Sequence, residues 1–300
     1  MAKKKRYTEF LIFKAVGLLV FSLPRKLCLT AGKLLGRAVY ILDRKHRTLA
    51  LSNLKTAFGS ELSDRKRKRC AMRTFENFGK VFIDIIKLYH LPPQKIEKII
   101  SIDGEQNLLD ALSKGTGILL FTAHFGNWEI GPLFLSKIAK LNVIARPMDN
   151  ILLEKELLKI RKKAGANVIY KQKASREVFR ALQAGEMVAI LIDQNVLQDQ
   201  AIFVDFFGKK AATTPGLAAL FLKTGAPLVP AFGHLTASGN YSVKISKPLE
   251  INLEKEYDRD VLKITQLCTN IIEDQIRKFP DHWFWFHNRW KTRPEGEQNV

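Results

Sequence analysis

The chain has 300 residues, of which 46% are apolar, so it is long enough to bury a sizeable core and too apolar for an intrinsically disordered protein. It carries 49 Lys+Arg against 29 Asp+Glu, a net charge of +20, and such a surface favours nucleic acid, anionic lipid headgroups or an acidic protein. The three cysteines are scattered without any Cys-x-x-Cys spacing, which excludes a disulfide framework or a zinc site and fits a reducing cytoplasmic compartment.

The N-terminal segment 7–42 is predicted to be a membrane anchor. A basic start at 1–6 precedes an apolar run over 10–23 that only Lys14 interrupts, and Pro24 closes this run before a second apolar stretch at 27–42. The uninterrupted run is shorter than the ~20 residues that a spanning helix needs, which favours two amphipathic helices lying in the membrane interface. A single spanning helix in which Lys14 snorkels is the alternative. Residues 1–43 are therefore assigned to the anchor, with the rest of the chain on the cytoplasmic side.

Segment 44–90 is helical in pattern and strongly basic, with five consecutive cations at 65–69. A solvated helix face and a contact with lipid headgroups both account for these charges. Leu91-Pro92-Pro93 breaks the helix, because proline cannot continue the backbone hydrogen bonds. We therefore divide residues 44–300 into a helical lead-in at 44–91 and a catalytic body at 92–300.

Apolar runs of β character alternate with helical patterns through this body. Strands are predicted at 118–122, 142–145, 167–170, 187–193, 227–232 and 241–246. Helices are predicted between several of them, at 152–164, 175–184 and 215–223. This alternation predicts an α/β sandwich with a mostly parallel central sheet.

Three of the predicted strands end in polar clusters. The first cluster is Thr122-Ala-His124, the second runs from Arg146 through Asp149, and the third contains Asp193 and Gln194. Functional groups of parallel sheets gather at the carboxyl ends of the strands. We therefore expect these side chains to converge on one site.

His124 and Glu129 are the candidate catalytic pair. They flank the segment Phe125-Gly-Asn127-Trp128 directly after an apolar strand, and glycine makes a tight turn possible there. If His124 lies in the turn and Glu129 in the first turn of the following helix, the carboxylate can hold one ring nitrogen and leave the other free to accept a proton. A purely structural pair is the alternative. Metal binding is disfavoured, because no second His or Cys lies nearby at ligand spacing.

The C-terminal segment 281–290 is dense in aromatic side chains. It is predicted to be a packed lid or the edge of the core, with Arg289 reaching the site.

Taken together, these motifs resemble the lipid A late acyltransferases of Gram-negative bacteria, also called lauroyl or myristoyl acyltransferases. The matching blocks follow the family's order from the N-terminal anchor almost to the last residue: His124-Phe-Gly-Asn-Trp-Glu129, Arg146-Pro-Met-Asp-Asn150, Asp193-Gln194, Val204-Asp-Phe-Phe-Gly208 with Thr213-Thr-Pro-Gly216, and Trp285-Phe-His-Asn-Arg289-Trp-Lys-Thr-Arg293-Pro294. A His and an acid at this spacing are shared by all glycerolipid acyltransferases, whereas the combination of five blocks is highly specific.

The resemblance implies a glycerolipid-acyltransferase-like α/β fold at the cytoplasmic face of the inner membrane. It implies transfer of an acyl chain from acyl carrier protein, an acidic partner, to a hydroxyl of a phosphorylated glycolipid, by a monomer without metal or cofactor. Among the matching positions, His124 and Glu129 are assigned to catalysis. The positions assigned to substrate binding are Asn127, Trp128, Arg146, Asp149, Asp193, Gln194 and Arg289.

In the expected mechanism, His124 is the general base on the acceptor hydroxyl and Glu129 orients its ring. Backbone amides near Asn127 and Trp128 and the Arg146 guanidinium are candidate donors to the negative tetrahedral oxygen. No acyl-enzyme is needed.

Two rival functions remain. A related glycolipid or lysophospholipid acyltransferase would use another acceptor, although the chain lacks the Phe-Pro-Glu-Gly-Thr block of the glycerol-phosphate acyltransferases. A basic nucleic-acid-binding membrane protein is disfavoured, because no nucleic-acid motif is visible and the aromatic residues do not interleave with the basic runs.

Overall fold

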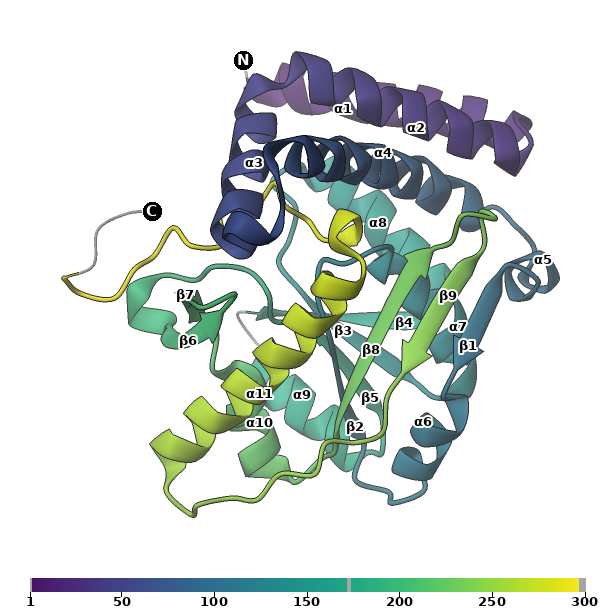
Figure 1. The fold of residues 1–300 in the computed structure, drawn as a ribbon. Coiled ribbons are helices and arrows are strands. Elements are labelled where there is room, and N and C mark those ends of the chain that lie inside the picture. The colour runs from purple at the N-terminus through teal and green to yellow at the C-terminus, as the bar shows by residue number, and fades with distance from the viewer. Residues whose placement is uncertain (1, 172–173, 297–300) are drawn as a thin grey trace.

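A computed structural model describes residues 2–171 and 174–296 (Figure 1). The helices are α1 Ala2–Ser22, α2 Arg25–Leu42, α3 Arg44–Phe58, α4 Asp64–Leu88, α5 Pro93–Glu97, α6 Glu105–Leu112, α7 Gly131–Ile138, α8 Ile151–Lys163, α9 Ala174–Gln183, α10 Gly216–Thr224 and α11 Tyr257–Lys278. The short 3₁₀ helices are η1 Gly59–Glu61, η2 Trp128–Ile130, η4 Gln198–Gln200 and η5 Pro280–His282. The strands are β1 Ile100–Asp103, β2 Ile118–Thr122, β3 Leu141–Ala145, β4 Ala166–Tyr170, β5 Met187–Leu191, β6 Ile202–Phe206, β7 Lys209–Thr213, β8 Leu228–Leu235 and β9 Tyr241–Ile245.

The central sheet has seven strands in the order β1-β9-β8-β2-β5-β3-β4. All neighbouring strands are parallel except the antiparallel pair β8 and β9. The strands β6 and β7 form a separate antiparallel hairpin. The predicted mostly parallel sheet is therefore confirmed.

Helices cover both faces of the sheet, as the alternating side chains of β2 show. Leu119 and Phe121 pack into a core cluster with side chains of α9, α10 and α11. Ile118 and Leu120 point to the opposite face and pack with side chains of α6 and α7. Since successive side chains of a strand face opposite sides, a continuous apolar run such as 118–121 requires burial on both faces. The α/β sandwich follows from this burial.

The six predicted strands correspond to β2, β3, β4, β5, β8 and β9, and the three predicted helices correspond to α8, α9 and α10. β1, the hairpin β6–β7 and the long helix α11 were not predicted. Lys-rich β7 lacks a strong apolar alternation, and its pairing with β6 stabilises it as a strand.

The N-terminal segment forms two helices, α1 and α2, separated at Leu23-Pro24, as the apolar pattern predicted. They lie along one side of the molecule over α4 (Figure 1). None of the helices in the described ranges is long and apolar enough to cross a membrane. The division into an anchor at 1–43 and a body at 44–300 stays a prediction.

Candidate active site

The turn that follows β2 carries His124 and is held rigidly from two sides. Gly126 has a φ of +53°, and a Cβ atom there would lie 2.0 Å from the carbonyl oxygen of Gly233, so only glycine fits. The Gly126 amide donates to the His282 carbonyl at 2.7 Å, and the Asn127 amide donates to the Gly233 carbonyl at 3.2 Å. Strand β8 and the segment after α11 thus fix the backbone on which the His124 ring stands.

The carboxylate that contacts the His124 ring is Asp193. Its Oδ1 lies 2.9 Å from His124 Nδ1, and its Oδ2 accepts the His124 backbone amide at 2.9 Å. The indole N–H of Trp283 donates to the same Oδ2 at 2.8 Å. Strands β2 and β5 are parallel neighbours with Thr122 opposite Leu191, so the residues two positions beyond each strand meet. Asp193 therefore belongs to the histidine's own hydrogen-bond system.

The environment keeps Asp193 ionised. Its side chain is almost completely buried, and burial alone would raise its pKa, but the His124 ring and the donors from Trp283 and the His124 amide outweigh burial and hold the pKa below its ordinary value. An ionised carboxylate can only accept, so His124 Nδ1 carries the proton and Nε2 carries the lone pair in the neutral ring, where it can accept a hydrogen bond. Gln194 Nε2 lies 3.2 Å from that Nε2. The geometry is that of a general base.

The prediction that Glu129 contacts the His124 ring is wrong, because its carboxylate pairs with Arg161. Glu129 lies in the 3₁₀ helix η2, and both of its carboxylate oxygens accept from Arg161 of α8, with a distance of 3.1 Å from Arg161 Nε. The short helix directs this side chain towards α8, whereas Trp128 packs on the His124 ring at 4.9 Å between centroids. With four residues between them, Glu129 lies near the turn that carries His124, but its carboxylate does not contact the His124 ring.

The Glu129–Arg161 pair is buried in the wall of the site. Burial disfavours the charge on Arg161, but the hydrogen bond and the charge of Glu129 more than offset this and place its pKa above its ordinary value. Two charges held this way cost free energy to bury, and removing either one leaves the other unpaired. Sequence reasoning missed Arg161, because only the fold brings α8 against the turn.

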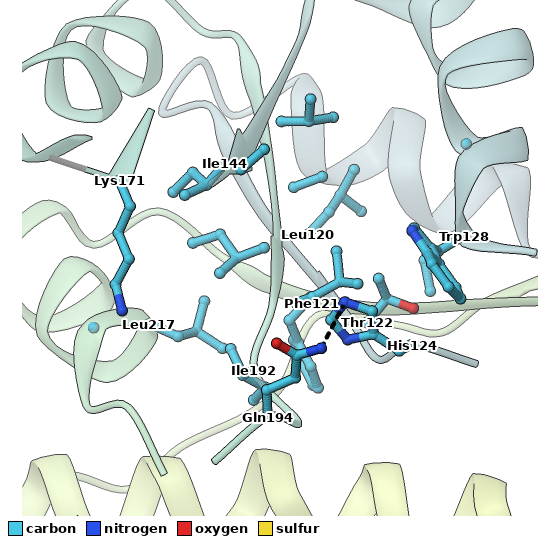
Figure 2. Close-up of a pocket in the computed structure, with 18 of the residues that line it drawn as sticks. Leu120, Phe121, Thr122, His124, Trp128, Ile144, Lys171, Ile192, Gln194 and Leu217 are labelled. Atoms are coloured by element: carbon cyan, nitrogen blue, oxygen red, sulfur yellow. Dashed lines mark hydrogen bonds between the residues drawn. The ribbon is translucent and has the colours of Figure 1, made fainter. Parts of the chain in front are cut away.

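A cavity of about 1070 Å³ opens beside His124. His124, Trp128 and Gln194 lie at one side of it, and Lys171 lies across an apolar floor that contains Leu120 and Ile144 (Figure 2). Its apolar walls come from both faces of the sheet, with Leu120, Phe134 and Val143 on one face and Ile144, Ile190 and Leu217 on the other. A ligand with a long apolar part and a reactive polar group fits this combination.

Two further predicted residues lie at the rim. Arg146 lines the cavity, but its side chain is 80% exposed and pairs at 3.0 Å with Asp149, whose side chain is 90% exposed. Asp149 itself is not among the lining residues.

Asn127 lines the cavity, but its side-chain amide points into the protein and donates to the Tyr241 hydroxyl at 2.9 Å. Its backbone amide is taken by Gly233, so of the two backbone amides expected to stabilise an oxyanion, that of Asn127 is not free.

The expectation that Arg289 reaches the site is wrong. Its side chain is only 1% exposed and does not line the cavity. It donates to the Ala212 carbonyl and the Thr213 hydroxyl of β7, and its guanidinium lies 5.2 Å from the centre of the Phe206 ring. Burial lowers its pKa to about 10, although the charge of Asp193 opposes this. Arg289 therefore joins the C-terminal segment to the β6–β7 hairpin.

The aromatic C-terminal segment 281–290 supports His124 and Asp193 through specific hydrogen bonds, which its composition alone did not predict. Trp283 supports Asp193, and the Phe284 amide donates to the His124 carbonyl at 3.0 Å. The Phe284 ring lies 6.2 Å from the His124 ring. The segment is thus part of the core edge behind the histidine. Across the described residues, no cluster of three or more His, Cys, Asp or Glu side chains could hold a metal ion.

Residues 2–292 match the model of the bacterial lipid A biosynthesis acyltransferase family. The chain belongs to this family. The resemblance drawn from the sequence blocks is thereby confirmed.

Two curated relatives from Escherichia coli cover nearly the same length, and a mycobacterial one covers less. The lipid A biosynthesis lauroyltransferase of Escherichia coli K12 is 26% identical over 93% of this chain and 90% of its own. The lipid A biosynthesis palmitoleoyltransferase of the same strain is 25% identical over 93% of this chain and 89% of its own. A phosphatidylinositol mannoside acyltransferase of Mycobacterium tuberculosis is 23% identical over 72% of this chain and 69% of its own.

Among solved structures, the 1-acyl-sn-glycerophosphate acyltransferase PlsC of Thermotoga maritima is similar with a TM-score of 0.36 and 16% sequence identity. The similarity covers 83% of this chain and 99% of that one.

Proposed function

We propose that this protein transfers a fatty acyl chain from the thioester of an acyl carrier protein to a hydroxyl of a phosphorylated lipid A precursor, in lipopolysaccharide biosynthesis. The observation that carries the proposal is His124, held by Asp193 beside a large apolar cavity. A base that can deprotonate a hydroxyl and a cavity that can hold an acyl chain are the two requirements of this reaction. Family membership and the two Escherichia coli relatives support the same acceptor class.

In the proposed reaction, His124 Nε2 takes the proton of the acceptor hydroxyl as its oxygen attacks the thioester carbonyl. The carbon–oxygen bond forms, the carbon–sulfur bond breaks, and His124 returns the proton to the leaving sulfur. Asp193 holds the ring by Nδ1 and stabilises the imidazolium that forms. Because the hydroxyl attacks directly, no covalent acyl-enzyme is required.

Donors near His124 would stabilise the negative tetrahedral oxygen. The candidates are the Trp128 amide at the start of η2 and the Gln194 side-chain amide, whose nitrogen lies 3.2 Å from His124 Nε2. Glu129 is a positioning residue in the proposal, because it holds the Arg161 guanidinium in the cavity wall. Arg146, Lys171 and Arg161 line the cavity, and their charges suit a phosphorylated substrate.

We also propose that α1 and α2 rest on the cytoplasmic leaflet of the inner membrane. The exposed large apolar side chains of α1, of α2 and of the link between them are Tyr7, Leu11, Ile12, Leu18, Leu19, Phe21, Leu23, Leu27, Leu34, Leu35, Val39, Ile41 and Leu42. A net charge of +20 adds attraction to anionic headgroups and to an acidic carrier protein. Deleting residues 1–42 should abolish flotation with vesicles of phosphatidylethanolamine and phosphatidylglycerol, and unchanged flotation would contradict the docking.

A second acceptor class has one specific observation in its favour. The Mycobacterium tuberculosis relative is a phosphatidylinositol mannoside acyltransferase, so the family scaffold is similar to that of an enzyme for another glycolipid. The decisive assay incubates the purified chain with an acyl carrier protein thioester and either a lipid A precursor or a mannosylated phosphoinositide. Product should form with the lipid A precursor and fall at least ~100-fold in His124→Ala. A folded His124→Ala protein of normal activity would exclude the mechanism.

A further inference from the structure

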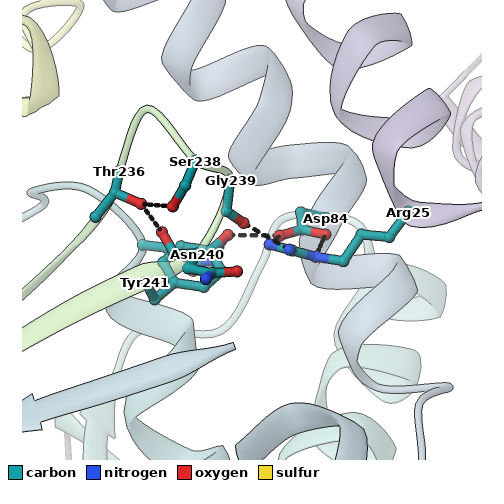
Figure 3. A network of polar contacts seen from close by, with 8 residues as sticks. Arg25, Asp84, Thr236, Ser238, Gly239, Asn240 and Tyr241 are labelled. Atoms are coloured by element: carbon teal, nitrogen blue, oxygen red, sulfur yellow. Dashed lines mark hydrogen bonds and ion pairs between the residues drawn. The ribbon is translucent and has the colours of Figure 1, made fainter. Parts of the chain in front are cut away.

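A polar network joins α2 and α4 to β9, through Arg25, Asp84 and Tyr241 (Figure 3). It continues from Tyr241 to Asn127, in the turn that carries His124. Arg25, the first residue of α2, donates from Nε to Asp84 Oδ1 of α4 at 2.8 Å and from Nη2 to Asp84 Oδ2 at 2.5 Å. Arg25 Nη1 also donates to the Gly239 carbonyl at 2.5 Å. The Tyr241 hydroxyl of β9 donates to Asp84 Oδ2 at 2.8 Å. Asp84 thus receives donors from both the helical layer and the sheet.

The network ends at Asn127, three residues after the histidine. Because the Tyr241 hydroxyl gives its proton to the Asp84 carboxylate, it can only accept from Asn127, and the amide must present Nδ2 to it at 2.9 Å. Asn127 Oδ1 makes no hydrogen bond. Tyr241 and Asn127 are both fully buried, so a hydrogen bond lost between them is not replaced by bulk water. The side-chain orientation of Asn127 is therefore set by Tyr241.

Tyr241 stays protonated in this position. Burial and the charge of Asp84 raise the pKa of its hydroxyl well above the ordinary value. The hydroxyl therefore remains a donor to Asp84 and an acceptor for Asn127 at every pH at which an enzyme of this kind works.

The layer that carries Arg25 and Asp84 is close-packed. A Cβ atom on Gly32 of α2 would lie 2.6 Å from the Gly79 carbonyl oxygen of α4, and a Cβ atom on Gly79 would lie 2.2 Å from the Gly32 carbonyl oxygen. A Cβ atom on Gly36 would lie 2.0 Å from a backbone carbonyl of α4. The backbones of α2 and α4 are in direct contact, so the two helices form one packed layer that presents Arg25 and Asp84 together.

We propose that Arg25, Asp84 and Tyr241 are positioning residues for acyl transfer: they fix Asn127, and with it the turn 124–128, from the α2–α4 layer. The inference rests on the proposed function and extends it, because it gives the N-terminal helices a part in the geometry of the active site besides membrane contact. A displacement of about 1 Å at a reacting group can cost ~100-fold in rate, so a hydrogen-bond chain that ends in this turn has kinetic consequences.

The test is Tyr241→Phe in the full chain, with and without Asn127→Ala. The substitution removes one hydroxyl and leaves both Arg25 hydrogen bonds to Asp84 in place. We expect kcat to fall about 10-fold, with KM for the acyl carrier thioester and for the glycolipid within two-fold of wild type. In the Asn127→Ala background the same substitution should lower kcat no further. Tyr40→Phe, in α2 with its ring against Phe75, is the matched control and should change nothing.

Hydrogen–deuterium exchange gives a second readout that does not depend on turnover. Tyr241→Phe and Arg25→Gln should both speed exchange at 124–128 while exchange in α7 and flotation with phosphatidylethanolamine–phosphatidylglycerol vesicles stay unchanged. An equal loss of kcat with and without the Asn127 side chain, or unchanged exchange at 124–128, would overturn the positioning role. A wild-type chain without acyl transfer would instead refute the proposed function, and the exchange result would still decide this inference.

Discussion

Replacing Asp193 by asparagine is the sharpest perturbation of the site. The substitution keeps the shape of the side chain and removes its charge. Asp193 Oδ2 accepts two N–H donors, from the His124 backbone and from Trp283, whereas Oδ1 faces only His124 Nδ1. The amide oxygen of the asparagine must therefore take the Oδ2 position, and its NH₂ group must face the ring.

This arrangement reverses the tautomer of His124. An NH₂ group can only donate, so Nδ1 becomes the acceptor and the ring proton moves to Nε2, the nitrogen that should accept the substrate proton. Loss of a general base costs 10²- to 10⁴-fold, and a reversed tautomer in a serine protease triad costs about 10⁴-fold. We expect kcat of Asp193→Asn to fall by about 10³-fold while the fold is retained.

Turnover of the acyl carrier thioester with a lipid A precursor measures the rate, and ¹⁵N chemical shifts of labelled histidine report the tautomer. Glu129→Gln is the matched control, because it removes a carboxylate that pairs with Arg161 and does not contact the ring. It should reduce activity through Arg161 but leave the His124 tautomer unchanged. A changed tautomer in Glu129→Gln together with an unchanged one in Asp193→Asn would refute the assignment of Asp193 as the partner of His124.

Three further predictions concern the turn, the rim and the thiols. Gly126→Ala should lower the free energy of unfolding by more than the ~1–3 kcal/mol that a strained positive φ costs, because its Cβ would collide with Gly233. Gly225→Ala, which has open space around its Cβ, is the control and should show the cost of the strained φ alone. Equal shifts in melting temperature for the two variants would contradict this prediction. If Arg146 holds a phosphate through its planar fork, Arg146→Lys and Arg146→Ala should both raise KM for the phosphorylated acceptor, and full rescue by lysine would argue for charge alone. Burial raises the pKa of all three thiols, so replacing the cysteines together should leave kcat intact, and mass spectrometry should find no acyl adduct; an adduct formed at the rate of turnover would indicate a ping-pong mechanism.

Local patterns were sufficient for the elements that build the centre of the sheet. The run 118–122 is β2 with the predicted bounds, because a short apolar run that ends in a glycine-containing turn favours a strand covered on both faces. The helix at 152–164 is found at Ile151–Lys163, preceded by the cap residue Asn150, whose side chain accepts the Leu152 amide. The hairpin β6–β7 has no comparable local signal, because its strands depend on pairing with each other.

For the active site too, the sequence predicts some features and leaves others to the tertiary structure. That His124 and Asp193 lie at the carboxyl edge of a parallel sheet follows from the sequence, because both directly follow apolar strands. Which acid contacts the ring does not follow from it. Glu129 is nearer in the chain, but the neighbouring register of β2 and β5 brings Asp193 to the ring, and α8 draws Glu129 to Arg161.

The fold class, the family blocks and the strand end that carries the histidine could all be predicted from the sequence. They depend on apolar periodicity and on the residue types that directly follow each strand. The hydrogen-bond partners depend on the tertiary fold: Asp193 for His124, Trp283 for Asp193, Arg161 for Glu129, and the Ala212 carbonyl of β7 for Arg289. Each of these contacts joins residues more than 30 positions apart in the chain, and their side chains meet only when strands pair and helices pack on the sheet.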